Sequence, residues 1–160
     1  MILLVRNIKS LSIFNSIFYF LIRLFTNSRY NHAVLLKKEH GVYKVYESHT
    51  KGFKTYKTLE TFIKEQKKYQ RELLPISLDN FDEERFKSLI GNNYNARYWN
   101  YLIGRRGKVK PTTATNCFQS IGYIYHLPQW WKVRTKDIIA YNTNKFTTHE
   151  ESIIKRLGKI

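Results

Sequence analysis

The stretch that decides the fold covers residues 30–48 and reads Y-N-H-A-V-L-L-K-K-E-H-G-V-Y-K-V-Y-E-S. Two runs rich in apolar and β-branched residues, Tyr30–Lys37 and Val42–Ser48, flank a short polar segment that includes Gly41. Glycine tolerates the positive φ that tight hairpin turns require. The pattern therefore predicts an antiparallel hairpin with its turn at Lys38–Gly41.

The position of the turn determines which residues face each other. With the turn at Lys38–Gly41, Val34 faces Val45 and His32 faces Glu47. Opposed side chains on one face have Cβ atoms about 4.5–5.5 Å apart, so His32 and Glu47 can share a hydrogen bond. A carboxylate beside an imidazole fixes its tautomer and raises its basicity, as in the base and orienting residue of a catalytic triad. The alternative is an ordinary polar pair at the end of a sheet, and a three-residue turn would break this register.

The rest of the chain mixes strand and helix patterns. We expect further strands at Met1–Arg6, Phe53–Tyr56 and Tyr69–Ile76, and helices at Ser10–Phe25, Thr58–Gln66, Ser77–Ile90, Asn95–Ile103, Thr112–Tyr125 and Thr148–Leu157. Gly104–Pro111 is expected to be a basic loop. These elements predict an α+β fold, in which helices pack against a small antiparallel sheet. The length suits a single domain over residues 1–160, and the role of the tail, residues 128–160, stays open.

Composition limits the classes of function. Of the 160 residues, 42% are hydrophobic, which excludes a disordered or collagen-like chain. The single cysteine, Cys117, excludes a disulfide within the chain and a Cys-only zinc site. The formal net charge of +16 favours an anionic partner, which could be nucleic acid, an anionic membrane surface or a charged cell-wall polymer. We expect no cofactor and no bound metal.

The segment Ile8–Phe25 is apolar enough to suggest a signal peptide or a membrane span. Polar residues such as Ser12, Asn15 and Arg23 interrupt it, and no small-residue cleavage site follows. Its apolar residues recur at spacings of three and four, which predicts a buried helix, with an interfacial membrane helix as the alternative. We therefore expect neither a signal peptide nor a transmembrane helix, and a cytoplasmic or phage-associated protein.

Familiar catalytic signatures are absent, including the P-loop, the H-E-x-x-H zinc helix and the G-x-S-x-G nucleophile elbow. Cys117 remains as a candidate nucleophile. The preceding run Thr112–Asn116 supplies several possible N-caps, which places Cys117 in the first turn of its helix. The partial positive charge at that position stabilises a thiolate. The alternative is that Cys117 is simply a small buried hydrophobic residue.

Several segments resemble the circularly permuted NlpC/P60 superfamily of papain-like cysteine hydrolases, in the branch of the YiiX-type proteins. Met1–Arg6 is similar to the opening strand of the family, and Ser28–Val34 to its histidine strand. Val45–Ser48 is similar to the strand with the third polar residue. Ile90–Asn95 with Thr115–Ser120 is similar to the glycine–tyrosine stretch with the nucleophile helix. In permuted members the histidine precedes the cysteine, as His32 precedes Cys117 here.

The resemblance implies a papain-like permuted NlpC/P60 fold, with Cys117 as nucleophile, His32 as base and Glu47 as orienting residue. It implies hydrolysis of amide bonds, of the peptide or peptidoglycan type, through a thioester. Backbone N–H groups at the start of the cysteine helix are expected to stabilise the oxyanion. Two features depart from the family pattern: the chain lacks the Gly-Asp that often begins the first strand, and Phe118 stands where a small polar residue is common.

Two alternatives stay open. Related permuted folds act on acyl lipids, and the apolar Ser10–Phe25 helix together with the positive charge would suit a lipid-directed acyltransferase or amidase at a membrane surface. A basic nucleic-acid-binding or virion-associated protein without enzymatic activity is the second alternative, although no known nucleic-acid-binding motif supports it. Basic clusters interleaved with aromatic residues favour it: Lys64–Arg71, the residues Arg105, Arg106, Lys108 and Lys110, and Trp130–Lys132.

Overall fold

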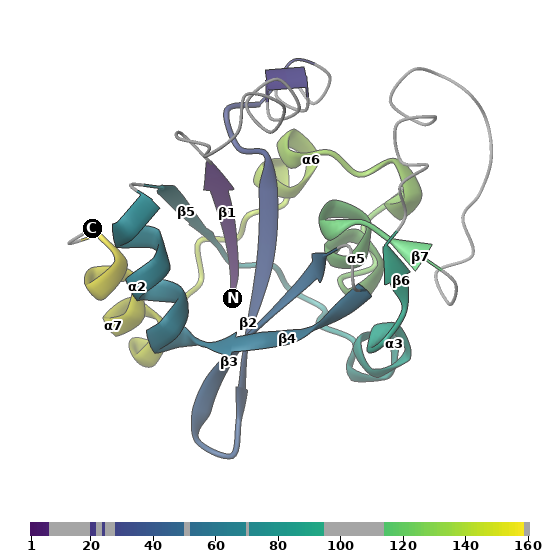
Figure 1. The fold of residues 1–160 in the computed structure, drawn as a ribbon. Coiled ribbons are helices and arrows are strands. Elements are labelled where there is room, and N and C mark those ends of the chain that lie inside the picture. The colour runs from purple at the N-terminus through teal and green to yellow at the C-terminus, as the bar shows by residue number, and fades with distance from the viewer. Residues whose placement is uncertain are drawn as a thin grey trace.

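The computed structural model describes residues 1–6, 20, 21, 24, 28–49, 52–69, 71–94 and 114–158. Its centre is a five-stranded antiparallel sheet in the order β4-β3-β2-β1-β5 (Figure 1). The strands are β1 (Ile2–Arg6), β2 (His32–Glu39), β3 (Val42–His49), β4 (Gly52–Thr58) and β5 (Glu72–Ile76). The helices are α2 (Leu59–Tyr69), α3 (Glu83–Leu89), α5 (Cys117–Ile124), α6 (Thr135–Ala140) and α7 (Thr148–Leu157), with a 3-10 turn at Trp130–Lys132. A small antiparallel sheet with several helices confirms the predicted α+β class.

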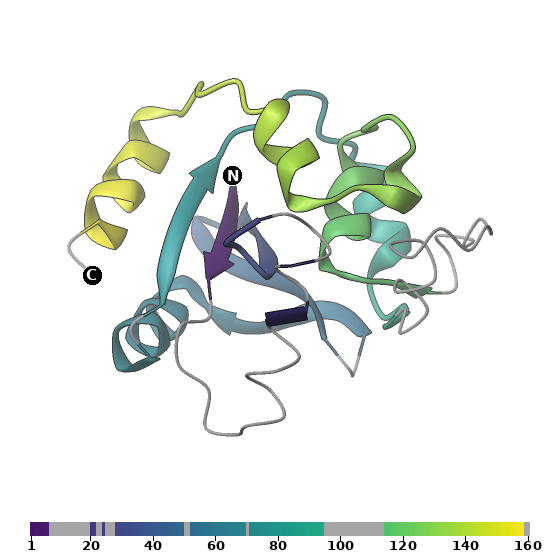
Figure 2. The ribbon, with the colours of Figure 1, turned by 90° about the horizontal axis from the view of Figure 1, so that it is seen from above.

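Helices cover both faces of the sheet, with α2 and α7 on one side and α3, α5 and α6 on the other (Figure 2). Because successive side chains of a strand point to opposite faces, β1 and β2 supply apolar residues to two separate cores. The core under α2 and α7 contains Leu3, Val5, Val34, Leu36, Val45, Leu59, Phe62, Ile63, Ile153 and Leu157. The core on the opposite face includes Ile2, Leu4, Ala33, Leu35, Tyr46, Phe53, Phe86, Phe118, Ile121 and Ile138.

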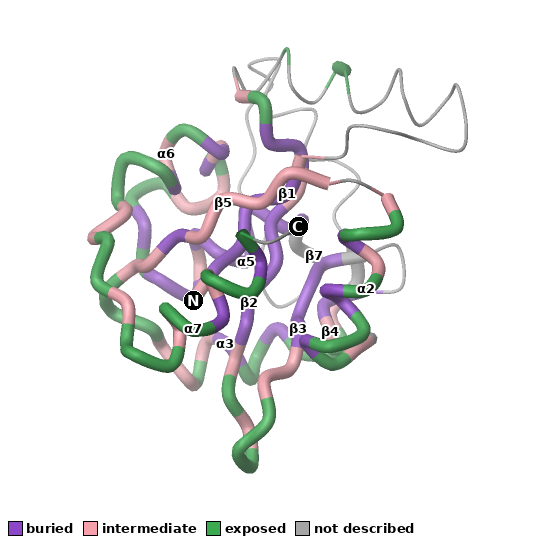
Figure 3. Tube along the Cα trace, turned by 90° about the vertical axis from the view of Figure 1, so that its left-hand side faces the viewer, coloured by how far each residue is buried: buried purple, intermediate pink, exposed green. Residues whose placement is uncertain are grey.

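The hairpin of β2 and β3 forms as predicted, but its register differs by two residues. Glu39 pairs with Val42 and Leu36 with Val45, so the turn consists of His40 and Gly41 alone. Both turn residues have positive φ, 48° and 82°, which is the backbone that a two-residue turn between twisted strands requires. The turn is exposed, whereas the middle of the two strands is buried (Figure 3).

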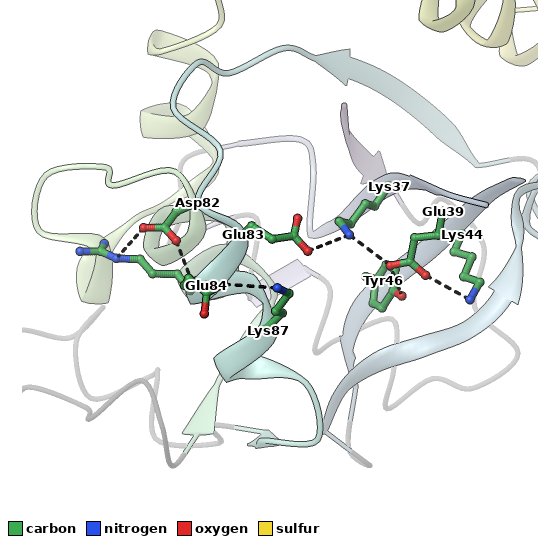
Figure 4. A network of polar contacts seen from close by, with 9 residues as sticks. Lys37, Glu39, Lys44, Tyr46, Asp82, Glu83, Glu84 and Lys87 are labelled. Atoms are coloured by element: carbon green, nitrogen blue, oxygen red, sulfur yellow. Dashed lines mark hydrogen bonds and ion pairs between the residues drawn. The ribbon is translucent and has the colours of Figure 1, made fainter. Parts of the chain in front are cut away.

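A network of polar side chains ties this hairpin to α3 (Figure 4). Lys37 Nζ lies 3.3 Å from Glu39 Oε1 and 3.1 Å from Glu83 Oε1 on α3. The Tyr46 hydroxyl donates to Glu39 Oε1 at 2.8 Å, and Lys44 Nζ is 3.1 Å from Glu39 Oε2. Glu39 thus joins both strands just before the turn, which supports the observed turn position.

Two predicted elements are shorter than their apolar pattern indicates. The helix predicted at Ser77–Ile90 is only α3, because Asn80 has a left-handed φ of 65° and the Asp82 carboxylate accepts the Arg85 N–H as an N-cap. The strand predicted at Tyr69–Ile76 begins at Glu72, because α2 continues to Tyr69.

The C-terminal half also differs from the prediction in detail. The helix predicted at Thr112–Tyr125 is α5, preceded by the two-residue strand β7 (Ala114–Thr115), which pairs in parallel with β6 (Asn93–Tyr94). α7 is confirmed, whereas α6 was not predicted. Both helices of the tail contribute to the cores, α6 through Ile138 and α7 through Ile153.

Some predicted elements lie outside the described residues. The helix predicted at Asn95–Ile103 and the basic loop Gly104–Pro111 are among them. Of the helix predicted at Ser10–Phe25, only residues 20, 21 and 24 are described, and these are helical. Within the described part of the chain, no helix combines the length and the apolar character that crossing a membrane requires.

Gly122 permits close packing of α5 against the segment that follows it. A Cβ atom at this position would lie 2.8 Å from Val133 Cγ2 and 3.2 Å from the Trp130 carbonyl oxygen. Side chains essentially never approach that closely, so alanine would push the segment 130–133 away from α5. At Gly158, by contrast, an added Cβ would meet only two backbone oxygens, at 3.4 and 4.0 Å, and the residue already has helical dihedral angles.

We predict opposite effects of alanine at these two glycines. Gly122→Ala should lower the free energy of unfolding by about 1–3 kcal/mol, the usual cost of overpacking. Gly158→Ala should raise it by up to about 1 kcal/mol, because alanine loses less backbone entropy in a helical conformation. Urea denaturation of both variants measures these changes, and a Gly122→Ala protein as stable as the wild type would contradict the packing described here.

Candidate active site

Cys117 is the first residue of α5, and Asn116 forms the N-cap. Asn116 Oδ1 accepts the backbone N–H groups of Phe118 at 2.8 Å and Gln119 at 2.9 Å, while Gln119 Oε1 accepts the Asn116 N–H at 3.2 Å. This capping box fixes the residue at which the helix begins. The predicted position of Cys117 in the first helical turn is therefore confirmed.

The environment of the thiol is largely apolar. Cys117 is only 7% exposed and belongs to the core beneath α5, as does the neighbouring Phe118. Phe118 stands where a small polar residue is common in the family that the sequence resembles. It is 2% exposed, so its ring packs within the core. A chemical role for Cys117 therefore depends on a polar partner at the end of the helix.

His32 and Glu47 form that polar pair. His32 Nε2 lies 2.8 Å from Glu47 Oε2, and the two side chains are 24% and 11% exposed. The observed register, continued beyond Leu35, places Glu47 opposite Val34 and His32 two residues further along the same face. The contact is therefore diagonal rather than directly across the hairpin, and the length of the glutamate side chain makes it possible.

The second partner of His32 is Cys117. The two side chains are close enough to interact both by charge and by hydrogen bonding. Because Glu47 occupies Nε2, the nitrogen that remains for the thiol is Nδ1. His32 is the first residue of β2, and the N-terminus of α5 meets the sheet at this end of the strand. The structure thus brings together Cys117, His32 and Glu47, the three residues that the sequence singled out.

The charges of the site reinforce one another. Burial by itself would lower the pKa of His32, but Cys117 and Glu47 act in the opposite direction and raise it from 6.5 to about 10. Burial would raise the pKa of Glu47, yet the hydrogen bond and charge of His32, followed by those of Lys57, lower it from 4.5 to about 2. Near neutral pH, an imidazolium therefore faces a carboxylate on one side and the sulfur on the other.

A pair of serines ties α5 to β3 beside the thiol. Ser48 Oγ and Ser120 Oγ lie 2.7 Å apart, and Ser120 Oγ also donates to the Asn116 carbonyl oxygen at 2.9 Å. Both side chains are buried. Ser48 follows Glu47 directly and points to the opposite face of the strand, so this contact fixes the helix relative to the strand that carries the carboxylate. Neither serine was singled out from the sequence, although strand alternation places Ser48 on the face of Tyr46.

Lys57 is a further residue of the site that the sequence did not indicate. Its Nζ lies 3.3 Å from Glu47 Oε1, the carboxylate oxygen that His32 does not use. The strand predicted at Phe53–Tyr56 stops just before Lys57, and a regular strand would have turned this side chain to the other face. Nothing in the sequence therefore pointed to the contact.

The other candidate features are separate from this site. The described part of the basic cluster Lys64–Arg71 belongs mainly to α2, and Lys64, Lys67 and Lys68 are exposed. Trp130 is partly buried and packs edge-on against Tyr123, with ring centroids 5.1 Å apart. Across the described ranges, no group of three or more histidine, cysteine, aspartate or glutamate side chains is arranged to hold a metal ion.

Comparisons with known proteins give no relative for this chain. No protein-family model matches the sequence. Searches of the curated proteins and of the solved structures likewise find no match.

The pKa values of the pair predict how Glu47→Gln changes stability with pH. The lowered pKa of Glu47 stabilises the fold above about pH 4.5, and this contribution is lost as the pH falls towards 2. The raised pKa of His32 stabilises the fold below about pH 6.5, and this contribution is lost as the pH rises towards 10. Glu47→Gln should therefore cost most between pH 4.5 and 6.5, by about 1.5–3 kcal/mol, the range for hydrogen bonds to charged groups.

Denaturant unfolding of both proteins at a series of pH values measures this difference. Glu84→Gln serves as the control, because Glu84 forms an ion pair with Lys87 but is 87% exposed. Its effect should be close to zero at every pH. A cost of Glu47→Gln that does not vary with pH would show that the pair carries no charge in the folded protein.

Proposed function

We propose that this protein is a thiol hydrolase that cleaves amide bonds, of the peptide or peptidoglycan type, through a Cys-His-Glu triad. Cys117 is the nucleophile, His32 the general base and Glu47 the orienting residue. The observation that carries the proposal is the position of His32, which contacts Glu47 through Nε2 at 2.8 Å and interacts with the thiol of Cys117 at the N-terminus of α5. A buried cysteine without chemical function requires neither partner.

The reaction starts from a resting ion pair in which His32, an imidazolium near neutral pH, already carries the proton of the Cys117 thiol. The thiolate attacks the carbonyl carbon of the amide, and a carbon–sulfur bond forms as the carbonyl oxygen becomes an oxyanion. His32 then donates its proton to the leaving amine as the carbon–nitrogen bond breaks, which leaves a thioester on Cys117. A water molecule, deprotonated by His32, hydrolyses the thioester and restores the thiol. Glu47 remains ionised throughout and keeps Nε2 as the protonated ring nitrogen.

The oxyanion requires hydrogen-bond donors near the sulfur. The capping side chain of Asn116 already occupies the N–H groups of Phe118 and Gln119, so these two amides do not serve. The backbone N–H of Cys117 donates to no acceptor among the described residues. We assign it as the backbone donor for the oxyanion, with the positive end of the α5 dipole behind it.

The order of these residues along the chain supports the permuted NlpC/P60 fold as the finer description of the architecture. The histidine strand β2 and the glutamate strand β3 precede the cysteine helix α5, which packs against the antiparallel sheet. This is the arrangement that the family resemblance implies for a papain-like site with the histidine first. The net charge of +16 suits an anionic cell-wall polymer as the substrate.

The alternatives have less support from the described residues. A lipid-directed enzyme depends on the segment Ser10–Phe25, most of which lies outside them. A nucleic-acid-binding protein depends on free aromatic rings, whereas Trp130 packs against Tyr123 and the core. The lipid-directed enzyme would use the same triad, whereas the nucleic-acid-binding protein does not explain why a histidine–carboxylate pair lies beside the single cysteine.

Amide cleavage tests the proposal directly. We expect the purified protein to release peptides from isolated peptidoglycan or from its stem peptides, detected by mass spectrometry. Cys117→Ala should abolish release because no nucleophile remains. Glu47→Gln should reduce kcat by up to about 10⁴-fold while leaving residual activity, because it disturbs the orientation of His32 and not the nucleophile.

Two results would contradict the assignment. The first is equal activity of the wild type and Cys117→Ala. The second is cleavage confined to acyl lipids, with binding to anionic liposomes in a flotation assay, which would favour the lipid-directed enzyme.

A further inference from the structure

Glu47 is held between two cations rather than one. Its Oε2 faces His32 at 2.8 Å, and its Oε1 faces Lys57 Nζ at 3.3 Å. Lys57 also lies 2.6 Å from Glu65 Oε2 on α2. The Lys57 side chain is only 15% exposed, and its ammonium group lies 5.7 Å from the ring centroid of Phe62. A row of alternating charges thus runs from the thiol to the surface, through His32, Glu47, Lys57 and Glu65.

A β-bulge in β4 brings Lys57 to this position. Between Gly52 and Thr55, β4 pairs with β3 so that Lys54 faces Glu47 and Thr55 faces Tyr46. The register then shifts by one residue, and Lys57 faces Val45. If the first register had continued, Lys57 would face Lys44 and point to the other side of the sheet. The bulge therefore turns Lys57 to the face that carries Glu47, as bulges near active sites commonly do.

We propose that Lys57 is a positioning residue for the catalytic site, which fixes the carboxylate of Glu47 so that Oε2 stays on His32 Nε2. This inference rests on the proposed function, since it assigns a role in the same triad. A carboxylate with only one partner can rotate about its last bond, whereas a carboxylate that binds a cation on each oxygen has a defined plane. Glu65 fixes the ammonium group of Lys57 in turn. The orientation of His32 therefore depends, through Glu47, on residues that lie closer to the surface.

The positioning role of Lys57 requires both the long unbranched stem of its side chain and its positive charge. Because Glu47 is nearly buried, loss of Lys57 leaves a desolvated oxygen without a donor. The carboxylate is then expected to turn towards solvent, and His32 loses the partner that holds its tautomer. Arginine retains a positive charge and N–H donors at this position, whereas methionine retains the unbranched stem over Phe62 without them.

The test compares Lys57→Met with Lys57→Arg in two measurements. The first is proton NMR of the His32 Nε2–H, which hydrogen-bonds to Glu47. Lys57→Met should speed its exchange with solvent by about tenfold, the equivalent of one net hydrogen bond, while Lys57→Arg should remain close to the wild type. Lys44→Met is the matched control, since it removes a comparable ion pair, 3.1 Å from Glu39, without touching Glu47.

The second measurement is the rate of Cys117 alkylation by iodoacetamide in a double-mutant cycle. Lys57→Met should slow alkylation several-fold in the wild-type background and have no effect in the Glu47→Gln background, because Lys57 acts only through Glu47. A merely structural lysine would give the same effect in both backgrounds. Lys57→Gln replaces Lys57→Met in both measurements if the latter does not fold.

The outcomes separate this inference from the proposed function. Unchanged exchange of the His32 proton in Lys57→Met overturns the positioning role, whatever the activity of the protein. Rapid exchange in Lys57→Met with recovery in Lys57→Arg supports it. If His32→Ala leaves the alkylation of Cys117 unchanged, the proposed function fails, and the NMR comparison still decides whether Lys57 orients Glu47.

Discussion

The hydrogen bond between His32 Nε2 and Glu47 Oε2 is the contact on which the site depends. It links β2 to β3 at the end of the sheet where α5 begins, and it decides which ring nitrogen faces Cys117. Other contacts of the fold fix the positions of the cysteine helix and of the strand that carries Glu47. The Asn116 capping box fixes the start of the cysteine helix, and the Ser48–Ser120 contact keeps that helix against the strand of Glu47.

The hairpin shows how much of this site follows from sequence. The predicted register was wrong by two residues, because the turn uses His40 and Gly41 with positive φ at both. A shift by an even number of residues leaves every side chain on its predicted face. His32 and Glu47 therefore still share a face, and the pairing that the sequence indicated forms as a diagonal contact. The capping of Cys117 was predictable for a simpler reason, since Asn116 and Gln119 are local signals three residues apart.

The features that the sequence did not show arise from local departures from regular strand or helix backbone. The bulge in β4 leaves no mark in the apolar pattern, so the contact of Lys57 with Glu47 was not predictable. The apolar residues Leu78 and Phe81 fit a helical pattern, yet Asn80 and the Asp82 cap delay α3 until Glu83. In both cases a local backbone conformation outweighs hydrophobic periodicity.

Alkylation of the native protein at pH 7 measures whether His32 activates Cys117, and it requires no known substrate. We predict that iodoacetamide modifies Cys117 in the wild type, that His32→Ala slows the reaction, and that His149→Ala does not, since His149 stacks on Tyr43 instead. Because Cys117 is only 7% exposed, oxidation by the smaller hydrogen peroxide serves as a parallel probe. A thiol that resists both reagents until the protein unfolds, whatever residue occupies position 32, would contradict the account and leave Cys117 as a residue of the core.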